Sequence, residues 1–204
     1  MFTGIVQGIA RIESIEKKPG LHRLCVHFPQ GTMDGIARGA SVAIDGACLT
    51  ATDQDRDRLW FDVMMETLRA TTLGHRQEGD DVNFERAARI GDEIGGHLLS
   101  GHVHCTARVE SIESPENNRR LEFRVPDEWR HYLLPKGYIA VNGASLTIGE
   151  VTDSGFSVYL IPETLQATTL GELAQGESVN LEIDSQTQTI VDTLAKLNLK
   201  PATG

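Results

Sequence analysis

The chain contains the same unit twice, and the second copy begins 97 positions after the first. The copies align without insertion from Gly4 and Gly101 to Glu85 and Glu182, with about one residue in three identical. A match of this length is a tandem duplication. Two similar domains offer two similar pockets, so a reaction between two molecules of one substrate becomes feasible. The best-matched stretches are DGACLT at 45–50 against NGASLT at 142–147, and ETLRATTLG at 66–74 against ETLQATTLG at 163–171.

Size and charge limit the classes of protein that this chain can belong to. Its 204 residues fit two domains of about ninety residues each. Domains of that size bury a limited core, so we expect them to pack against each other or against other subunits. Acidic residues outnumber basic ones by 29 to 19, which gives a formal charge of −10. This balance argues against a nucleic-acid partner, which normally requires a basic face.

Nothing in the sequence indicates export, membrane insertion or a metal site. The first ten residues, MFTGIVQGIA, lack the basic segment and long apolar stretch of a signal peptide. No apolar run approaches the length of a membrane span. The three cysteines, Cys25, Cys48 and Cys105, are irregularly spaced, which favours neither a disulfide framework nor a zinc site. We therefore expect a soluble, cytoplasmic protein.

Each repeat is typical of a small β-domain. Its apolar and polar residues alternate over short runs bounded by Gly, Asp or Pro. Asp45-Gly46 and Asn142-Gly143 each stand between two such runs, and this dipeptide favours the positive φ angles of a tight hairpin turn. Six short strands fit a closed barrel or a sandwich, and closure removes exposed strand edges. The strands expected in the first repeat are 5–12, 24–28, 41–44, 48–52, 59–64 and 81–85.

Helices are expected at a few places. Residues 66–71, 163–168 and 127–134 predict short ones. After the second repeat, residues 188–199 predict an amphipathic helix that Asp184 or Ser185 can cap. This helix either packs on its own barrel or joins subunits. The first repeat is followed by a linker, 86–96, instead of a helix. The apolar stripe of the C-terminal helix consists of Ile190, Val191, Leu194 and Leu197.

Three groups of motifs closely resemble riboflavin synthase of the alpha-chain type. They are the opening MFTGIV, the segment GGHLLSGHV at 95–103, and the paired motifs of the two repeats. The resemblance covers essentially the whole chain. It implies a mainly β fold of two tandem six-stranded Greek-key barrels with a C-terminal α-helix. The implied domains are an N-terminal barrel with linker at 1–96, a C-terminal barrel at 97–184, and a trimerisation helix and tail at 185–204.

The resemblance also implies an activity and an assembly. Two molecules of 6,7-dimethyl-8-ribityllumazine would dismutate to riboflavin and 5-amino-6-ribitylamino-pyrimidinedione by transfer of a four-carbon unit, without cofactor or metal. This is the last step of riboflavin biosynthesis. The protein would be a homotrimer, and each active site would lie between the N-terminal barrel of one subunit and the C-terminal barrel of its neighbour. Lumazine synthase is a further partner that the family suggests.

The family's ligand contacts map onto both repeats. Most are backbone groups at strand edges, which supply donors and acceptors in the plane of a pteridine ring. The carboxylates Glu66 and Glu163 suit ribityl hydroxyls. The expected contacts with the N-terminal barrel are Gly4, Ile5, Val6, Cys48, Leu49, Thr50, Asp62, Val63, Met64, Met65, Glu66 and Thr67. Those with the C-terminal barrel are Gly101, His102, Val103, Lys136, Ser145, Leu146, Thr147, Leu160, Ile161, Pro162, Glu163, Thr164 and Leu165.

Differences between the repeats indicate where the chemistry is asymmetric. His102 replaces Ile5, Ser145 replaces Cys48, and Lys136 replaces Gly39. His102 is the candidate for proton transfer, because imidazole titrates near neutral pH. Its alternative role is that of a buried neutral histidine at a strand end. Cys48 is either a nucleophile, a hydrogen-bond donor or a packed small apolar residue. Ser145 and Thr147 are candidates for polarising the second ring.

One position departs from the common family pattern. Members often carry Asn in the first Asx-Gly turn and Asp in the second, whereas this chain has Asp45 and then Asn142. If the second carboxylate assisted catalysis, this chain would lack it. The turn itself is served equally well by either residue.

Three other kinds of protein are rivals for this sequence. A non-catalytic lumazine- or flavin-binding antenna protein of the same fold typically has a degraded C-terminal site, whereas here the second copy keeps His102, Lys136, Ser145 and Glu163. The flavin domain of a reductase would need a nicotinamide-binding βαβ unit, which the sequence lacks. A purely structural β-repeat protein leaves the matched polar clusters unexplained. The enzyme is the favoured interpretation.

Overall fold

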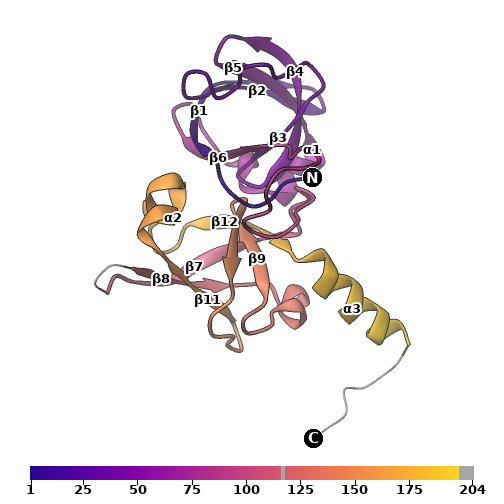
Figure 1. The fold of residues 1–204 in the computed structure, drawn as a ribbon, viewed down its shortest axis with the longest axis vertical. Coiled ribbons are helices and arrows are strands. Elements are labelled where there is room, and N and C mark those ends of the chain that lie inside the picture. The colour runs from indigo at the N-terminus through magenta and orange to yellow at the C-terminus, as the bar shows by residue number, and fades with distance from the viewer. Residues whose placement is uncertain (116–117, 198–204) are drawn as a thin grey trace, which may run out of the picture.

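The computed structural model describes residues 1–115 and 118–197. Two β-domains lie one above the other, and the C-terminal helix projects from the second (Figure 1). The predicted mainly β fold with two six-stranded units and a terminal helix is confirmed. No helix in residues 1–115 or 118–197 is long and apolar enough to cross a membrane.

The first repeat forms a closed barrel, the N-barrel, with strand order β1-β2-β5-β4-β3-β6. A short helix α1 (Met65–Ala70) and a 3₁₀ turn η1 (Thr72–Gly74) connect β5 to β6. The predicted helix at 66–71 is therefore confirmed. The strands are β1 (Gly8–Lys18), β2 (Leu21–His27), β3 (Ser41–Ile44), β4 (Ala47–Asp55), β5 (Arg58–Met64) and β6 (Asp81–Arg86).

The second repeat forms the C-barrel, with the equivalent strand order β10-β9-β12-β7-β8-β11. It is nearly closed, because the segment after β10 pairs with β11 through Gly149 N–H to Ser157 O (2.8 Å) and Ser157 N–H to Glu150 O (2.9 Å). Its elements are β7 (Cys105–Glu113), β8 (Arg119–Arg124), the 3₁₀ helix η2 (Asp127–Tyr132), β9 (Tyr138–Val141), β10 (Ala144–Thr147), β11 (Gly155–Leu160), α2 (Pro162–Ala167), η3 (Thr169–Gly171) and β12 (Ser178–Ile183).

One predicted strand begins later than expected. The sequence predicts a strand over residues 5–12, but β1 begins at Gly8. Gly4 has φ +74° and turns the chain away from the N-barrel. Ile5 and Val6 therefore leave the sheet and belong to a crossing segment described below.

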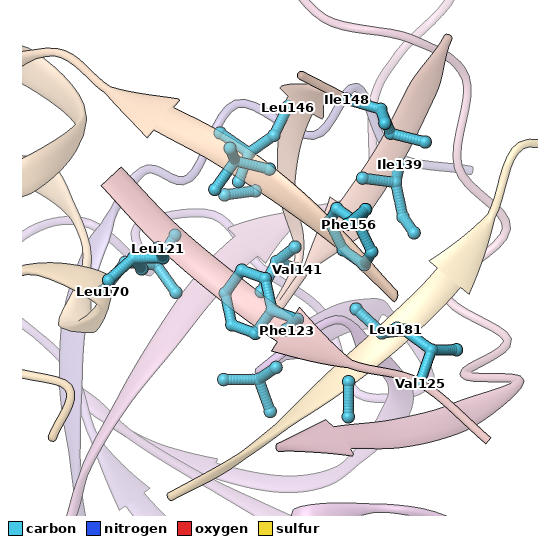
Figure 2. Close-up of a cluster of buried hydrophobic side chains, with 14 of the residues drawn as sticks. Leu121, Phe123, Val125, Ile139, Val141, Leu146, Ile148, Phe156, Leu170 and Leu181 are labelled. Atoms are coloured by element: carbon cyan, nitrogen blue, oxygen red, sulfur yellow. The ribbon is translucent and has the colours of Figure 1, made fainter. Parts of the chain in front are cut away.

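Alternation of side chains along the strands separates the barrel cores from the outer faces. In β4, Ala47, Leu49 and Ala51 are buried, whereas Thr50 is exposed and Cys48 half-buried. The C-barrel core contains Phe123 and Phe156, whose ring centroids are 5.3 Å apart, among aliphatic side chains (Figure 2). Burial of these apolar side chains is the main stabilising contribution to each barrel. Each barrel has its own core.

The barrels meet where the two Asx-Gly hairpin turns lie against each other. Asp45 and Gly46 have φ angles of 44° and 80°, and Asn142 and Gly143 have 44° and 82°, as the sequence predicts for such turns. A Cβ atom on Gly46 would lie 2.7 Å from the Gly143 nitrogen. Only glycine fits this contact.

Two asparagines connect the barrels across the same interface. The Asn83 Nδ2 donates to Asn142 O at 3.0 Å, and the Asn180 Nδ2 donates to Asp45 O at 2.8 Å. Asn83 and Asn180 are equivalent residues of the two repeats. The interface is thus reciprocal, and the barrels are related by a pseudo-twofold axis.

The terminal helix α3 (Ser185–Lys196) begins three residues before the predicted range of 188–199, and the predicted cap is confirmed, with the Asp184 carboxylate accepting from Thr187 N–H at 2.8 Å. Positions 198 and 199 of the predicted helix, and the tail 198–204, lie outside the described residues. The helix reaches its own barrel through Tyr132 Oη to Asp192. Three residues of its predicted apolar stripe stay exposed, Ile190 at 59%, Leu194 at 42% and Leu197 at 62%, and Val191 is half-buried. Packing on its own barrel therefore leaves most of the predicted apolar stripe uncovered.

Candidate functional site

Two short segments cross between the barrels. We call residues 2–6 the first strap and residues 99–103 the second strap. They pair with each other through Phe2 N–H to Leu99 O (2.8 Å) and Leu99 N–H to Phe2 O (3.0 Å). Phe2 and Leu99 are both buried, together with Ala43 and Ala140 at the barrel interface. The straps therefore run side by side along the interface.

A buried glutamate of each barrel holds the base of that barrel's own strap. The Glu85 carboxylate in β6 accepts hydrogen bonds from Thr3 N–H (2.6 Å), Thr3 Oγ1 (2.8 Å) and Gly4 N–H (3.0 Å). In β12, Glu182 accepts from Ser100 N–H (2.7 Å), Ser100 Oγ (2.7 Å) and Gly101 N–H (3.0 Å). Burial raises the pKa of Glu85. These contacts fix the direction in which each strap leaves its barrel.

Each strap then continues onto the opposite barrel. The Ser145 N–H of β10 donates to Gly4 O at 2.8 Å, and the Cys48 N–H of β4 donates to Gly101 O at 2.8 Å. A Cβ atom on Gly4 would lie 2.5 Å from Ser145 Cβ, and one on Gly101 would lie 2.5 Å from Cys48 Cβ. Both glycines have positive φ, +74° and +79°. The close approach requires glycine at both positions.

The crossing completes two equivalent cavities, one on each barrel. The cavity on the N-barrel, which we call the N-pocket, has a volume of about 290 Å³, and the C-pocket on the C-barrel has a volume of about 280 Å³. Every lining residue of one is the copy of a lining residue of the other. The N-pocket is lined by Ala47, Cys48, Glu66, Thr67, Ala70, Thr71, Gly101, His102 and Val103, and the C-pocket by Ala144, Ser145, Glu163, Thr164, Ala167, Thr168, Gly4, Ile5 and Val6.

This arrangement corrects the grouping of residues expected from the sequence. The sequence predicts contacts of Gly4 to Val6 with the N-barrel site and of Gly101 to Val103 with the C-barrel site, but the structure places each group against the other barrel. The reason is tertiary, because each strap is anchored by its own glutamate and points away from its own barrel. Position in the repeat does not reveal such an exchange.

The other expected contact residues fall into three sets. Lys136 is exposed with φ +68° and lines neither pocket. The exposed set, which lines neither pocket, is Thr50, Asp62, Met64, Thr147, Ile161 and Pro162. The set inside or against the barrel cores is Leu49, Val63, Met65, Leu146, Leu160 and Leu165, whose side chains are turned away from the outer face.

The four candidate catalytic residues divide between the pockets. His102 and Cys48 line the N-pocket, and Ser145 lines the C-pocket. Thr147 is the next outward-facing residue of β10 and is exposed outside the lining. The side chain of His102 is exposed, so the alternative of a buried histidine at a strand end is wrong. Proton transfer by His102 stays a prediction.

A further polar residue, just after the linker, contacts Ser145 of the C-pocket lining. His97 Nδ1 lies 2.6 Å from Ser145 Oγ, and the imidazole stacks on Tyr138 with ring centroids 5.0 Å apart. His97 is 7% exposed, and burial lowers its pKa. The sequence contained it only as part of the GGHLLSGHV motif. Because it precedes the matched part of the second repeat, comparing the repeats does not single it out.

Comparisons with known proteins agree with this architecture. The model of the lumazine binding domain matches residues 3–87 and 100–184. The chain is 52% identical to riboflavin synthase of Escherichia coli (strain K12) over 198 residues, covering 97% of this chain and 93% of that protein. It is 45% identical to riboflavin synthase of Chlamydia pneumoniae, covering 97% and 96%.

Solved structures of LumP have the same fold. LumP complexed with 6,7-dimethyl-8-(1'-D-ribityl) lumazine superposes with a TM-score of 0.82 at 27% identity. LumP complexed with riboflavin gives a TM-score of 0.85 at 28% identity. Both cover 91% of this chain and 100% of LumP. With two matched domains and relatives of this identity over almost its full length, the chain belongs to the riboflavin synthase family of tandem lumazine-binding proteins.

Proposed function

We propose that this protein is a riboflavin synthase that dismutates two molecules of 6,7-dimethyl-8-ribityllumazine. One molecule donates a four-carbon unit to the other, so the products are riboflavin and 5-amino-6-ribitylamino-pyrimidinedione. The observation that carries the proposal is the pair of residue-for-residue equivalent pockets on one chain. A reaction between two copies of one molecule needs two sites of one kind.

Each pocket offers suitable groups for a ribityl-substituted pteridine. The strap backbone supplies donors and acceptors for the ring amides, and Glu66 or Glu163 supplies a carboxylate for the ribityl hydroxyls. The C7 methyl group of the substrate is acidic, because the pteridine delocalises the carbanion. Holding two rings face to face therefore supplies much of the rate enhancement, on the order of 7 kcal/mol in favourable cases.

We propose further that the active site joins two subunits of a homotrimer. The N-pocket and the C-pocket share no lining residue, so one chain supplies two separate half-sites. The exposed apolar stripe of α3, which includes Ile190, Leu194 and Leu197, is a suitable contact between subunits. The N-pocket of one subunit then faces the C-pocket of its neighbour. A cytoplasmic location and a complex with lumazine synthase stay predictions from the family.

A non-catalytic lumazine- or flavin-binding protein is the second candidate, because LumP is the structural neighbour seen with both ligands. The higher identity to riboflavin synthases favours the enzyme. The polar lining kept in the C-pocket, with Ser145, Glu163 and Thr164, also favours it.

The deciding experiment incubates the full-length protein with 6,7-dimethyl-8-ribityllumazine and follows riboflavin absorbance. We expect one riboflavin for every two substrate molecules consumed, with the pyrimidinedione as coproduct. The doubly blocked variant Ala70→Trp/Ala167→Trp, which fills both pockets from their helices, is the matched control. Tight lumazine binding by the unmodified protein without riboflavin formation would refute the enzyme and leave the binding protein.

A further inference from the structure

The hydrogen bond between His97 and Ser145 makes the C-pocket different from its copy. The two atoms, His97 Nδ1 and Ser145 Oγ, are 2.6 Å apart, which is a short hydrogen bond. In the N-pocket the equivalent residue is Cys48, and no hydrogen bond joins its Sγ to another side chain among residues 1–115 and 118–197. The C-pocket therefore has a serine hydroxyl that is hydrogen-bonded to a histidine. At the equivalent position the N-pocket has a cysteine thiol, which is a weak hydrogen-bond donor.

The surroundings of His97 indicate where its proton lies. Its Nε2 is buried and has no hydrogen-bond partner within the described part of the chain. Orphaned buried N–H groups are rarer in proteins than acceptors with an unused lone pair. The neutral ring therefore carries its proton on Nδ1 and donates it to Ser145 Oγ. The hydroxyl proton of Ser145 is then free to be donated elsewhere.

The position of Ser145 is fixed from two further sides. A Cβ atom on Gly96, in the linker, would lie 2.7 Å from Ser145 Cβ and 2.9 Å from its Oγ. A Cβ atom on Gly4, in the first strap, would lie 2.5 Å from Ser145 Cβ. The linker and the strap thus enclose the serine, and the C-pocket, which Ser145 lines, is the open side left for its hydroxyl.

We propose that His97 is a positioning residue that acts through Ser145. It holds the Ser145 hydroxyl so that its proton is directed at a carbonyl oxygen or ring nitrogen of the heteroaromatic ring in the C-pocket. A donor fixed in advance stabilises negative charge that develops on that ring during the reaction. The inference rests on the proposed function and deepens it, because it assigns the stronger hydrogen-bond donor to the C-barrel half of the active site.

The test is a double-mutant cycle in the full-length protein with 6,7-dimethyl-8-ribityllumazine. His97→Phe keeps an aromatic ring on Tyr138 but removes the hydrogen bond, and Ser145→Ala removes the hydroxyl. We expect each to lower kcat about tenfold with KM changed much less, because the bond is most valuable where charge develops. The double variant should be no slower than Ser145→Ala. Wild-type kcat in His97→Phe, or multiplicative losses in the double variant, would overturn the proposal.

Two variants separate positioning from general damage. In His97→Asn the amide nitrogen stands where Nδ1 stood, so we expect it to recover a large part of kcat. Cys48→Ala alters the equivalent position of the other pocket, so its effect should multiply with that of His97→Phe. Failure of His97→Asn to exceed His97→Phe, when both melt at the wild-type temperature, would indicate a merely structural histidine.

A binding measurement keeps this inference distinct from the proposed function. In the Ala70→Trp background the N-pocket is filled, so lumazine fluorescence reports the C-pocket alone. We expect His97→Phe to weaken lumazine binding there only about twofold, in line with the small change in KM, and to shift the emission of the bound ring. The readout works even if the protein forms no riboflavin. Unchanged affinity and emission would overturn the positioning role, whereas absent turnover alone would refute only the enzyme.

Discussion

Asp45 and Asn142 occupy the same turn position in the two repeats and are both fully buried, but within the described part of the chain only Asp45 contacts a cation. Arg76 Nη2 lies 2.7 Å from the Asp45 carboxylate, whereas the copy of Arg76 is the buried apolar Leu173. Both turns lie between the barrels and line neither pocket. The reversal of Asp and Asn relative to the family pattern therefore changes the interface between the barrels and removes no carboxylate from a pocket.

The second repeat has a neutral pair of residues, Asn142 and Leu173, in place of the Asp45–Arg76 ion pair of the first. Arg76→Leu leaves the buried Asp45 carboxylate without its cation, and we expect a loss of about 3 kcal/mol in the free energy of unfolding. Adding Asp45→Asn recreates the neutral arrangement of Asn142 and Leu173, so the double variant should regain most of that loss. Urea unfolding of the four proteins measures the cycle. Additive effects of the two substitutions would show that the pair is not coupled.

The same carboxylate gives the stability of the protein a pH dependence. Burial raises the pKa of Asp45 despite the attraction of Arg76. Between the unfolded pKa of about 3.9 and the higher folded value, the native state holds a proton that the unfolded state has released. The contribution of Asp45 to the free energy of unfolding therefore decreases as pH rises through this window.

This effect is measured as the difference between the free energies of unfolding of two proteins over a range of pH. The free energy of unfolding of wild type minus that of Asp45→Asn/Arg76→Leu should fall from pH 4 upward and then become flat. The matched control is Asp153→Asn, the same exchange of Asp for Asn at an exposed position. A difference that rises with pH would mean that the buried carboxylate is stabilised in its charged form.

Much of the fold could be predicted because local patterns determine it. The alternation of apolar and polar residues predicts the strands, because one face of each strand is buried. For the strand at 41–44 both predicted ends are correct. The hairpin turns could be predicted from Asp45-Gly46 and Asn142-Gly143, because these residues tolerate positive φ angles. The cap of the terminal helix could be predicted from Asp184. The exchange of straps could not be predicted, because it depends on which barrel the tip of each strap contacts. His97 was not singled out for the same reason, since Ser145 is 48 residues away.

The straps predict an effect that crosses from one barrel to the other. Glu85 belongs to the N-barrel, but the strap that it anchors lines the C-pocket. In Glu85→Gln an amide N–H₂ replaces one acceptor oxygen, so a strap donor loses its partner. We expect ligand affinity to fall about fivefold to tenfold in the C-pocket and to change little in the N-pocket. Glu182→Gln should give the opposite pattern, because Glu182 anchors the strap that lines the N-pocket.

Riboflavin fluorescence titration separates the two pockets. The N-pocket is measured in the Ala167→Trp background and the C-pocket in the Ala70→Trp background, so that one pocket is filled in each protein. Loss of affinity in the barrel that carries the substitution, with the opposite pocket unchanged, would contradict the exchange of straps.

The proposed site between subunits predicts that two inactive proteins restore activity when they are mixed within one trimer. Ala70→Trp fills the N-pocket and Ala167→Trp fills the C-pocket, so each homotrimer should be inactive. In co-expressed mixed trimers, some sites combine the intact N-pocket of one variant with the intact C-pocket of the other. Every cyclic trimer that contains both variants has one such site among its three, so about a third of wild-type activity should return in the purified mixed trimers.

The geometry of the trimer decides this result. Tagging the two variants differently and purifying only the mixed trimers removes the inactive homotrimers from the measurement. The control is co-expression of Ala70→Trp with the doubly blocked Ala70→Trp/Ala167→Trp chain, in which no site has an intact N-pocket. If mixed trimers are as inactive as this control, the two rings meet within one chain. In that case the apolar face of α3 joins subunits without completing their active sites.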